Sequence, residues 1–278
     1  MKYVGAHVSS SGGVHHAPVR AAEIGAGAFA FFTKNQKRWR AKPLLPDDIE
    51  RFRRNLSASG IAPEHVLPHD SYLINLSNPD GEKREKSYST FIDEAGRAEA
   101  LGLTLFNFHP GAHLGAMSEA EAIRLIAEGV DRACETIDRI VFVAETTAGQ
   151  GSSLGYIFEH LRDLIGETSY PDRMGICIDT CHIFAAGYDI RTEESYREVM
   201  ERFDRVIGLS KLRGIHCNDS KNELGSRVDR HEMLGQGKIG WSAFRFLMQD
   251  SRLDNIPIIL ETPDPDRWAD EIQQLKGE

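Results

Sequence analysis

The chain has 278 residues, of which 41% are hydrophobic and 27% are charged, and its formal net charge is -9. This is an ordinary globular composition, and no apolar run approaches the length of a membrane-spanning helix, so we expect no membrane partner. The acidic balance argues mildly against a nucleic-acid partner, although bound divalent cations would offset much of that charge locally. We expect one domain over residues 1–278, because α/β barrels commonly reach this size.

Eight short hydrophobic segments predict eight strands, at residues 3–8, 28–35, 65–70, 105–110, 140–145, 175–182, 214–219 and 257–261. The segments between and after them have helical periodicity. They predict helices at residues 15–26, 46–60, 83–102, 118–136, 153–166, 192–208, 241–250 and 266–277. Pro46 and Gly60 are start and stop signals of the second helix, and Ser118 with Glu121 forms a capping box before the fourth.

This alternation predicts an α/β fold, a (β/α)8 TIM barrel with extended loops. A doubly wound open sheet is the alternative. It fits less well, because the polar strand ends come from the whole length of the chain, whereas an open sheet gathers its site at a switch point.

The N-terminus enters a strand at once and has no signal-peptide pattern. Three of the four cysteines, Cys177, Cys181 and Cys217, lie in predicted core strands or just beyond one, and the fourth is Cys134. Buried free thiols fit this placement better than disulfides, so we expect a reducing, cytoplasmic compartment. The sequence has no CxxC pair, which argues against a ribbon-type structural zinc site.

Nearly every predicted strand ends in a residue that can bind a metal ion, at the end where such barrels build their active sites. Glu145, Asp179 and Glu261 each follow a run of apolar residues. A buried carboxylate needs a charged or hydrogen-bonded partner, and cations are the natural compensation for three of them. Imidazole together with carboxylate suits zinc, with manganese or iron as alternatives at some sites.

Histidines end several of the same strands. His69, His109 and His216 lie at strand ends, and a single histidine there is more often a hydrogen-bonded core residue than a ligand. In company with the carboxylates we predict that all three bind metal. His7 ends the first strand, and we expect it to contact phosphate or to support a ligand.

Two further pairs extend the set. His182 follows Asp179 by three residues, just beyond its strand, and the spacing of Asp229 and His231 puts both side chains on one side of an extended segment. Alone, the second pair would be read as a solvated ion pair with neighbouring arginines such as Arg230. Nine candidate ligands are too many for one tetrahedral ion and predict a cluster of two or three, a recurring arrangement for phosphoester cleavage.

Long motifs in this chain resemble the endonuclease IV family, the zinc-dependent apurinic/apyrimidinic-site endonucleases of DNA base excision repair. They are GAHVSSSGG, FFTKNQKRW, HDSYLINL, ETTAGQGSSLG, IDTCHIFAAGYD, HCNDSKNELGSRVDRHEMLGQGKIG and ETP. The resemblance runs in order from the first strand to near the C-terminus. It implies three zinc ions per chain, with DNA-binding loops at the C-terminal face of the strands.

All nine metal-binding positions of the family are present. The resemblance assigns one zinc to His69, His109 and Glu145, a second to Glu145, Asp179, His216 and Glu261, and a third to His182, Asp229 and His231. It implies hydrolysis of the phosphodiester 5′ to an abasic site in duplex DNA by a metal-activated water that the catalytic Glu145 orients. The products are a 3′-hydroxyl and a 5′-deoxyribose phosphate, and blocked 3′ ends are also trimmed.

Residues 33–42 form a basic segment around Trp39, which is either a solvated loop or a phosphate-contacting loop at the barrel mouth. Its position favours the second interpretation. Apolar side chains after His69 can wedge into the base stack. The expected DNA contacts are Lys34, Asn35, Gln36, Lys37, Arg38, Tyr72, Leu73 and Arg230. Lys37 stands where the family often has arginine, and Thr146 where asparagine is common, so the division of roles between Lys37 and Arg38 stays open.

Two other functions compete. A metal-dependent sugar isomerase or epimerase on the same barrel would also ring its strand ends with His, Asp and Glu, but it has no use for Asp229 with His231 or for the basic segment. A non-catalytic DNA-damage binding module would not need a complete ligand set. Nothing in the sequence demands more than a monomer.

Overall fold

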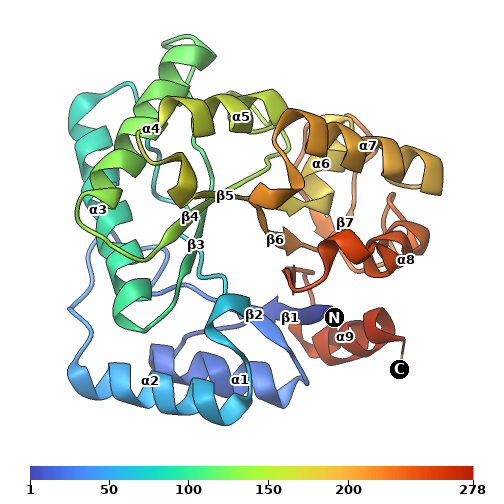
Figure 1. Ribbon diagram of the computed structural model, residues 1–278, viewed down its shortest axis with the longest axis horizontal. Helices are drawn as coiled ribbons and strands as arrows, with labels where there is room; N and C mark the ends of the chain where they lie inside the picture. Colours follow the sequence, from blue (N-terminus) through green and yellow to red (C-terminus); the bar gives the residue numbers. More distant parts are fainter. Residues whose placement is uncertain (278) are drawn as a thin grey trace.

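Seven of the eight predicted strand segments contain regular strands, and the computed structural model describes residues 1–277 of the chain (Figure 1). Seven strands form one parallel sheet in the order β2-β1-β9-β6-β5-β4-β3, and β7 and β8 form a separate antiparallel pair. The strands are β1 (Tyr3–His7), β2 (Ala28–Ala30), β3 (Leu105–Phe108), β4 (Val141–Glu145), β5 (Met174–Asp179), β6 (Leu212–His216), β7 (Asp219–Ser220), β8 (His231–Glu232) and β9 (Pro257–Leu260).

The third predicted strand closes the barrel between β2 and β3, although it is irregular. Its residues 66–69 make only isolated parallel bridges, to β2 and the residues after it and to Asn107 of β3. The His69 amide donates to the Phe31 carbonyl at 3.0 Å, and the Asn107 amide donates to the Pro68 carbonyl at 2.7 Å. Pro68 has no amide proton for the ladder, which explains why this segment is not a regular strand. The TIM barrel predicted from the sequence is therefore confirmed.

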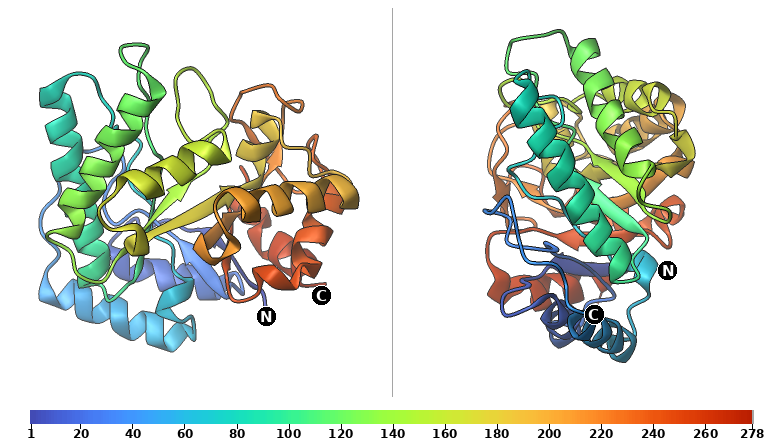
Figure 2. Two further views of the ribbon diagram at one scale, coloured as in Figure 1. Left: turned by 45° about the horizontal axis from the view of Figure 1, so that its top comes forward. Right: turned by 90° about the vertical axis from the view of Figure 1, so that its left-hand side faces the viewer.

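Helices surround the barrel, as the two further views show (Figure 2). Within residues 1–277 they are α1 (Ala17–Glu23), α2 (Pro46–Ser59), α3 (Gly81–Ala100), α4 (Glu119–Cys134), α5 (Phe158–Glu167), α6 (Thr180–Ala186), α7 (Glu193–Val206), α8 (Trp241–Gln249) and α9 (Trp268–Lys276). The eight predicted helices are all present. The capping box of Ser118 with Glu121 is formed, and Gly60 ends α2 with a φ of 73°. Helix α6 was not predicted, because its residues were assigned to a strand end.

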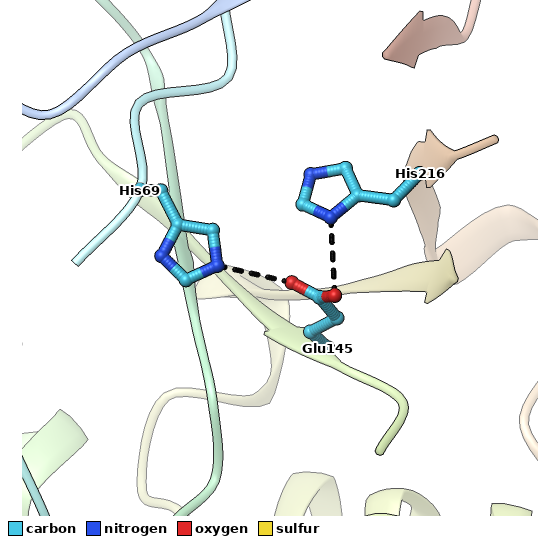
Figure 3. A group of neighbouring side chains, drawn as sticks. All are labelled: His69, Glu145 and His216. Atoms are coloured by element: carbon cyan, nitrogen blue, oxygen red, sulfur yellow. Dashed lines mark hydrogen bonds and ion pairs between the residues drawn. The ribbon is translucent and has the colours of Figure 1, made fainter. Parts of the chain in front are cut away.

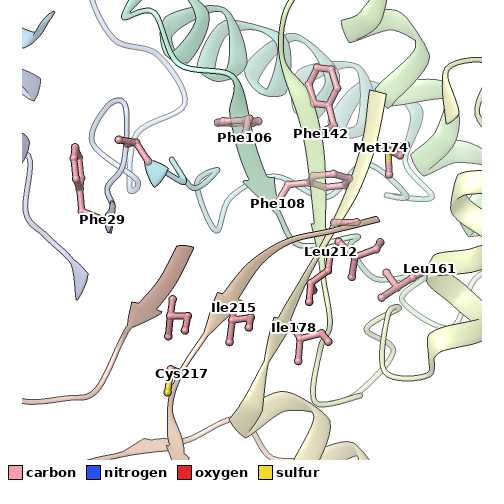
Figure 4. Packing of buried hydrophobic residues seen from close by; sticks show 14 of the residues in the cluster. Phe29, Phe106, Phe108, Phe142, Leu161, Met174, Ile178, Leu212, Ile215 and Cys217 are labelled. Atoms are coloured by element: carbon pink, nitrogen blue, oxygen red, sulfur yellow. The ribbon is translucent and has the colours of Figure 1, made fainter. Parts of the chain in front are cut away.

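Alternate residues of each strand pack on opposite sides of the barrel wall. One set faces the helices, where Phe106 and Phe108 of β3, Phe142 of β4 and Ile215 of β6 belong to the main core (Figure 4). The other set forms a small separate cluster inside the barrel. We call it the floor, and its buried members are Ala28, Ala30, Leu67, Leu105, Val143, Cys177 and Ile259. A strand has this period of two because successive side chains point to opposite faces.

Strand β6 contains one residue more than β5 over the same span. Ile176 pairs with Leu212, but Cys177 pairs with Gly214, so Arg213 is taken up in a bulge. Gly214 faces the floor, since a Cβ there would lie 2.5 Å from Cδ2 of Leu67 and 3.4 Å from Sγ of Cys177. A side chain at this position would therefore not fit inside the barrel.

The four cysteines are free and buried, as expected from their positions. Among the described residues, no helix has both the length and the apolar character that a membrane crossing needs.

Candidate metal centre

The polar site lies directly above the floor because of the same two-residue period. Five floor residues are each followed two positions later by a polar side chain on the same side of the strand. These successors are His69 after Leu67, Asn107 after Leu105, Glu145 after Val143, Asp179 after Cys177 and Glu261 after Ile259. His216 stands in the same relation to Gly214. We call this set the polar layer, and it lies at the C-terminal ends of the strands.

Glu145 occupies the middle of the polar layer and is fully buried at the end of β4. Nε2 of His69 lies 3.2 Å from one of its carboxylate oxygens, and Nδ1 of His216 lies 3.0 Å from the other (Figure 3). Nε2 of His109 lies 3.6 Å from the first oxygen. Histidines from three strand ends thus converge on one carboxylate, as a metal-bridging residue requires.

A second group joins Glu145 to the far side of the barrel. The donor atoms of Glu145, Asp179, His216 and Glu261 all lie within 4.8 Å of one another. Nδ1 of His216 lies 3.3 Å from a Glu261 oxygen. The other Glu261 oxygen is 2.6 Å from Nδ1 of His7, so the structure places His7 behind a candidate ligand. Such a neighbour fixes the orientation of the carboxylate.

The third group is formed by His182, Asp229 and His231. Nε2 of His182 lies 3.2 Å from one Asp229 oxygen, and Nε2 of His231 lies 3.4 Å from the other. Helix α6 positions His182, because the Asp179 side chain caps that helix and accepts a hydrogen bond from the His182 amide at 2.8 Å. All nine predicted ligands therefore belong to groups that could hold a metal ion, although His69 and His109 face Glu145 in separate groups.

In three of the histidines a backbone carbonyl anchors one ring nitrogen. Nδ1 of His69, His182 and His231 donates to the carbonyl oxygens of Asp70, Thr146 and Glu261, at 2.8, 2.7 and 3.1 Å. The opposite nitrogen, Nε2, then points at carboxylates in each case. Metal-binding histidines usually anchor their second nitrogen in this way, so the residues present fit bound metal ions.

The electrostatics also call for cations. Burial works to raise the pKa of Glu145, but the facing histidines, His216 and then His109, hold that pKa well below its usual value. Burial works to lower the pKa of His69, but hydrogen bonds to Asp70 and Glu145 raise it to about 10. Buried carboxylates in this number demand positive charge, which either protons on the histidines or metal ions supply.

Cys181 lies near Asp179 and His231 and could join them in a metal group. Burial raises the pKa of its thiol to about 12, and its Sγ lies 3.6 Å from the Arg230 carbonyl oxygen.

Two supporting asparagines were not predicted from the sequence. Nδ2 of Asn107 donates to Glu145 at 2.5 Å. Nδ2 of Asn218 donates to Asp179 at 2.8 Å, while its Oδ1 accepts from the Glu261 amide at 2.8 Å. The sequence signal for Asn107 was a polar residue at an inward-facing position of an otherwise apolar strand, as in LFNF.

Thr146 and Asp219 are two buried polar residues that are not candidate ligands. The Thr146 hydroxyl accepts from the Asp179 amide at 2.9 Å, so threonine holds the strand end where asparagine is common. Asp219 is a buried acid outside the metal groups. Its carboxylate accepts from the amides of Gly235, Gly237 and Ile239 at 2.9 to 3.1 Å, and a nest of amides satisfies an anion without a cation.

Most of the expected DNA contacts lie at the surface. Asn35, Lys37, Arg38 and Arg230 are exposed, Gln36 and Leu73 are half-buried, and the Tyr72 residue is 66% exposed. A cavity of about 390 Å³ opens beside the metal groups, and Tyr72, His109, Asp229 and Arg230 are among its lining residues. A phosphate group entering this cavity would meet the third metal group and His109.

Lys34 departs from the expectation. Its side chain is only 2% exposed, and its ammonium lies 3.0 Å from Oε1 of Glu94. A cation that is buried and already paired is poorly placed to reach a phosphate, so the direct contact of Lys34 with DNA stays a prediction that this structure does not support.

Comparisons with known proteins define the class first. The family model described as xylose isomerase-like TIM barrel matches residues 18–277. The crystal structure of endonuclease IV from Thermus thermophilus is 36% identical, with a TM-score of 0.87 over 99% of this chain and 98% of that chain. The chain belongs to the endonuclease IV family.

More distant structures share the barrel. A 3-keto-D-glucoside 4-epimerase from E. coli is 12% identical, covers 100% of both chains and has a TM-score of 0.69. A D-psicose 3-epimerase from Clostridium cellulolyticum is 13% identical, with a TM-score of 0.68 over 100% of this chain and 97% of that chain. At these identities the likeness extends to the fold alone.

Proposed function

We propose that this protein is a DNA repair endonuclease that hydrolyses the phosphodiester 5′ to abasic sites in duplex DNA. The products are a 3′-hydroxyl and a 5′-deoxyribose phosphate, and blocked 3′ ends are trimmed at the same site. The observation that carries the proposal is the gathering of nine His, Asp and Glu side chains, Glu145 among them, into groups that could hold metal ions, together with membership of the endonuclease IV family.

We infer that the site takes three zinc ions. His69 and His109, which face Glu145 in separate groups, would share one with it. The group of Glu145, Asp179, His216 and Glu261 would hold a second, and His182, Asp229 and His231 would hold the third. Bound zinc supplies Lewis acidity and a water that is acidic enough to be deprotonated near neutral pH.

The residues of the chain supply the geometry. Glu145 orients the attacking water, and Asn107 and His216 keep its two oxygens in place. The floor excludes bulk water from below, which strengthens every electrostatic interaction in the layer above. Lys37 and Arg38 are exposed at the barrel mouth, where they neutralise phosphates of the flanking duplex.

Tyr72 and Leu73 give selectivity for the lesion. They lie three and four residues beyond His69, and Tyr72 borders the cavity beside the metal groups. We infer that they fill the gap that the extruded nucleotide leaves in the base stack. An abasic nucleotide is the easiest to extrude, because no base has to be unstacked.

A sugar epimerase has the same fold, but two features favour the nuclease. The group of His182, Asp229 and His231 adds a third metal position. The exposed Lys37 and Arg38 suit a polyanion rather than a neutral sugar.

The test is incision of an end-labelled duplex with one abasic-site analogue, paired with metal analysis of the same preparation by mass spectrometry. We expect cleavage 5′ to the analogue, no cleavage of the matched intact duplex, and about three zinc ions per chain. A folded, fully metallated sample that leaves the abasic duplex uncut but epimerises a ketose would overturn the proposal.

A further inference from the structure

A buried ion pair lies beneath the two loops assigned to DNA recognition. Lys34 follows β2, and Glu94 lies in α3; Nζ of Lys34 is 3.0 Å from Oε1 of Glu94, with both side chains 2% exposed. Removing two charges from water is costly, and only good geometry with further hydrogen bonds offsets that cost. The surrounding contacts show what this pair holds.

Lys34 fixes the loop that carries the exposed cations, residues 33–42, which we call the basic loop. Its ammonium donates to the carbonyl oxygens of Arg38 and Trp39, each at 2.8 Å. The ion pair with Glu94 adds a third contact to the same ammonium. The Arg38 amide also donates to the Asn35 carbonyl at 3.0 Å. The Lys34 side chain therefore holds the turn that exposes Lys37 and Arg38.

Glu94 fixes the second loop, residues 70–73, which we call the wedge loop. Its Oε2 accepts from the amide of Ser71 at 2.8 Å, and Ser71 directly precedes Tyr72. The Glu94 carbonyl also accepts from the Thr33 hydroxyl at 3.3 Å, at the start of the basic loop. One carboxylate thus connects the two loops to each other and to α3.

Helix α3 holds the basic loop at two further points. The Arg97 guanidinium donates to the carbonyl oxygens of Ala41 and Lys42, at 3.3 and 2.8 Å. The Lys86 ammonium lies 4.1 Å from the centre of the Trp39 ring. The basic loop has no helix of its own, so these contacts determine its position.

We propose that Lys34 and Glu94 are positioning residues for DNA recognition: their buried pair locks the basic loop and the wedge loop in one relative arrangement. This proposal rests on the proposed function of those loops. Loops held before binding lose less conformational freedom in the complex, which improves affinity without any new contact. Buried ion pairs add little to stability when compared with apolar replacements, so a fixed loop geometry is the better account of this one.

The test uses the double variant Lys34→Met/Glu94→Gln in the metal-loaded enzyme. It removes both charges together, so neither is left buried and alone, and glutamine can still accept from the Ser71 amide. The matched control is Arg202→Met/Glu159→Gln, which removes an ion pair of 3.1 Å between α7 and α5 on another part of the barrel. Hydrogen exchange and incision kinetics are measured for both.

For the double variant we expect faster amide exchange in residues 33–42 and 70–73. We also expect KM for the abasic duplex to rise about tenfold or more, with kcat within about twofold and hydrolysis of bis(4-nitrophenyl) phosphate unchanged. The control should alter none of these. Unchanged exchange in the two loops would overturn the lock, and a loss confined to kcat would overturn its role in recognition.

A second variant, Arg97→Gln, releases only the far end of the basic loop. We expect faster exchange near residues 39–42, none in residues 70–73, and a smaller rise in KM; equal effects on both loops would contradict the assigned contacts. If wild-type enzyme does not cut abasic DNA, the proposed function fails. The exchange measurements would still decide whether Lys34 and Glu94 lock the loops.

Discussion

The floor of the barrel and the polar layer above it are built from the same strands, two residues apart, yet they are stabilised differently. Floor residues such as Val143 and Ile259 are buried in an apolar cluster. In the polar layer, Glu145 and Asp179 each contact several named donors. Packing tolerates exchanges of similar volume, whereas a buried carboxylate depends on particular partners. The comparison predicts that exchanges of similar volume are tolerated in the floor and that changes to the polar layer are not.

Changing a ligand of the polar layer should give the largest effect. We expect Glu261→Gln and His109→Ala each to lower the incision rate by about 1000-fold or more, because preorganised charge at the reacting phosphate is lost. The far-UV circular dichroism spectrum should stay that of the wild type. Incision of the abasic duplex measures the rate, and near-wild-type activity of either variant would contradict the ligand assignment.

A cavity in the floor should affect stability instead of chemistry. Leu67 is fully buried, so Leu67→Ala should lower the free energy of unfolding by about 2–5 kcal/mol. Urea unfolding in the presence of a chelator measures this without the contribution of metal binding.

The control is Leu45→Ala, since Leu45 is 63% exposed and should change stability by no more than about 0.5 kcal/mol. If both variants lost the same stability, the distinction between the floor and the surface would fail. If Leu67→Ala lost incision as completely as Glu261→Gln, the floor and the polar layer would not be separable.

Asn107 lies in the polar layer but is not a predicted ligand, so it sharpens the comparison. We expect Asn107→Ala to weaken metal binding by about 10- to 100-fold, because one Glu145 oxygen loses its fixed donor. Competition with a chelator of known affinity measures the change. Asn55→Ala is the control, since the Asn55 amide donates to the His15 carbonyl away from the site; equal losses in both variants would remove the assigned role.

The smallest expected effect lies outside both layers, at the exposed Tyr72. Tyr72→Ala should weaken binding to abasic duplex about tenfold, and binding to intact duplex much less, because the ring stacks only where a base is missing. Tyr72→Phe should keep most of the affinity. Fluorescence anisotropy with the two duplexes measures this, and equal losses on both would remove the wedge role.

Seven strands, the eight predicted helices and the candidate ligands at strand ends could be predicted from local signals, whereas Asp229 with His231 was a candidate only in company with them. Glu145 and Asp179 end apolar runs, and Ser118 with Glu121 marks a helix start whatever the rest of the chain does. Parallel strands in a barrel then bring their ends together without further information.

What could not be predicted depends on partners distant in the sequence. Lys34 reads as a loop cation until α3 places Glu94 beneath it. Asp219 ends the predicted strand segment 214–219 much as the ligands end theirs, but the amides of a later loop satisfy its charge. Helix α6 is a local exception, because the Asp179 side chain caps it although its sequence continues an apolar strand.

The bulge in β6 determines where this strand tolerates a change in length. Arg213 is the extra residue, and it lies below the polar layer, so His216 still pairs level with Asp179. Deleting Arg213 would remove the bulge and keep His216 facing inward. Deleting Ile215 instead would turn His216 toward the helices, because a shift of one residue moves every later side chain to the other face. Strand β6 therefore keeps its register without Arg213 but not without Ile215.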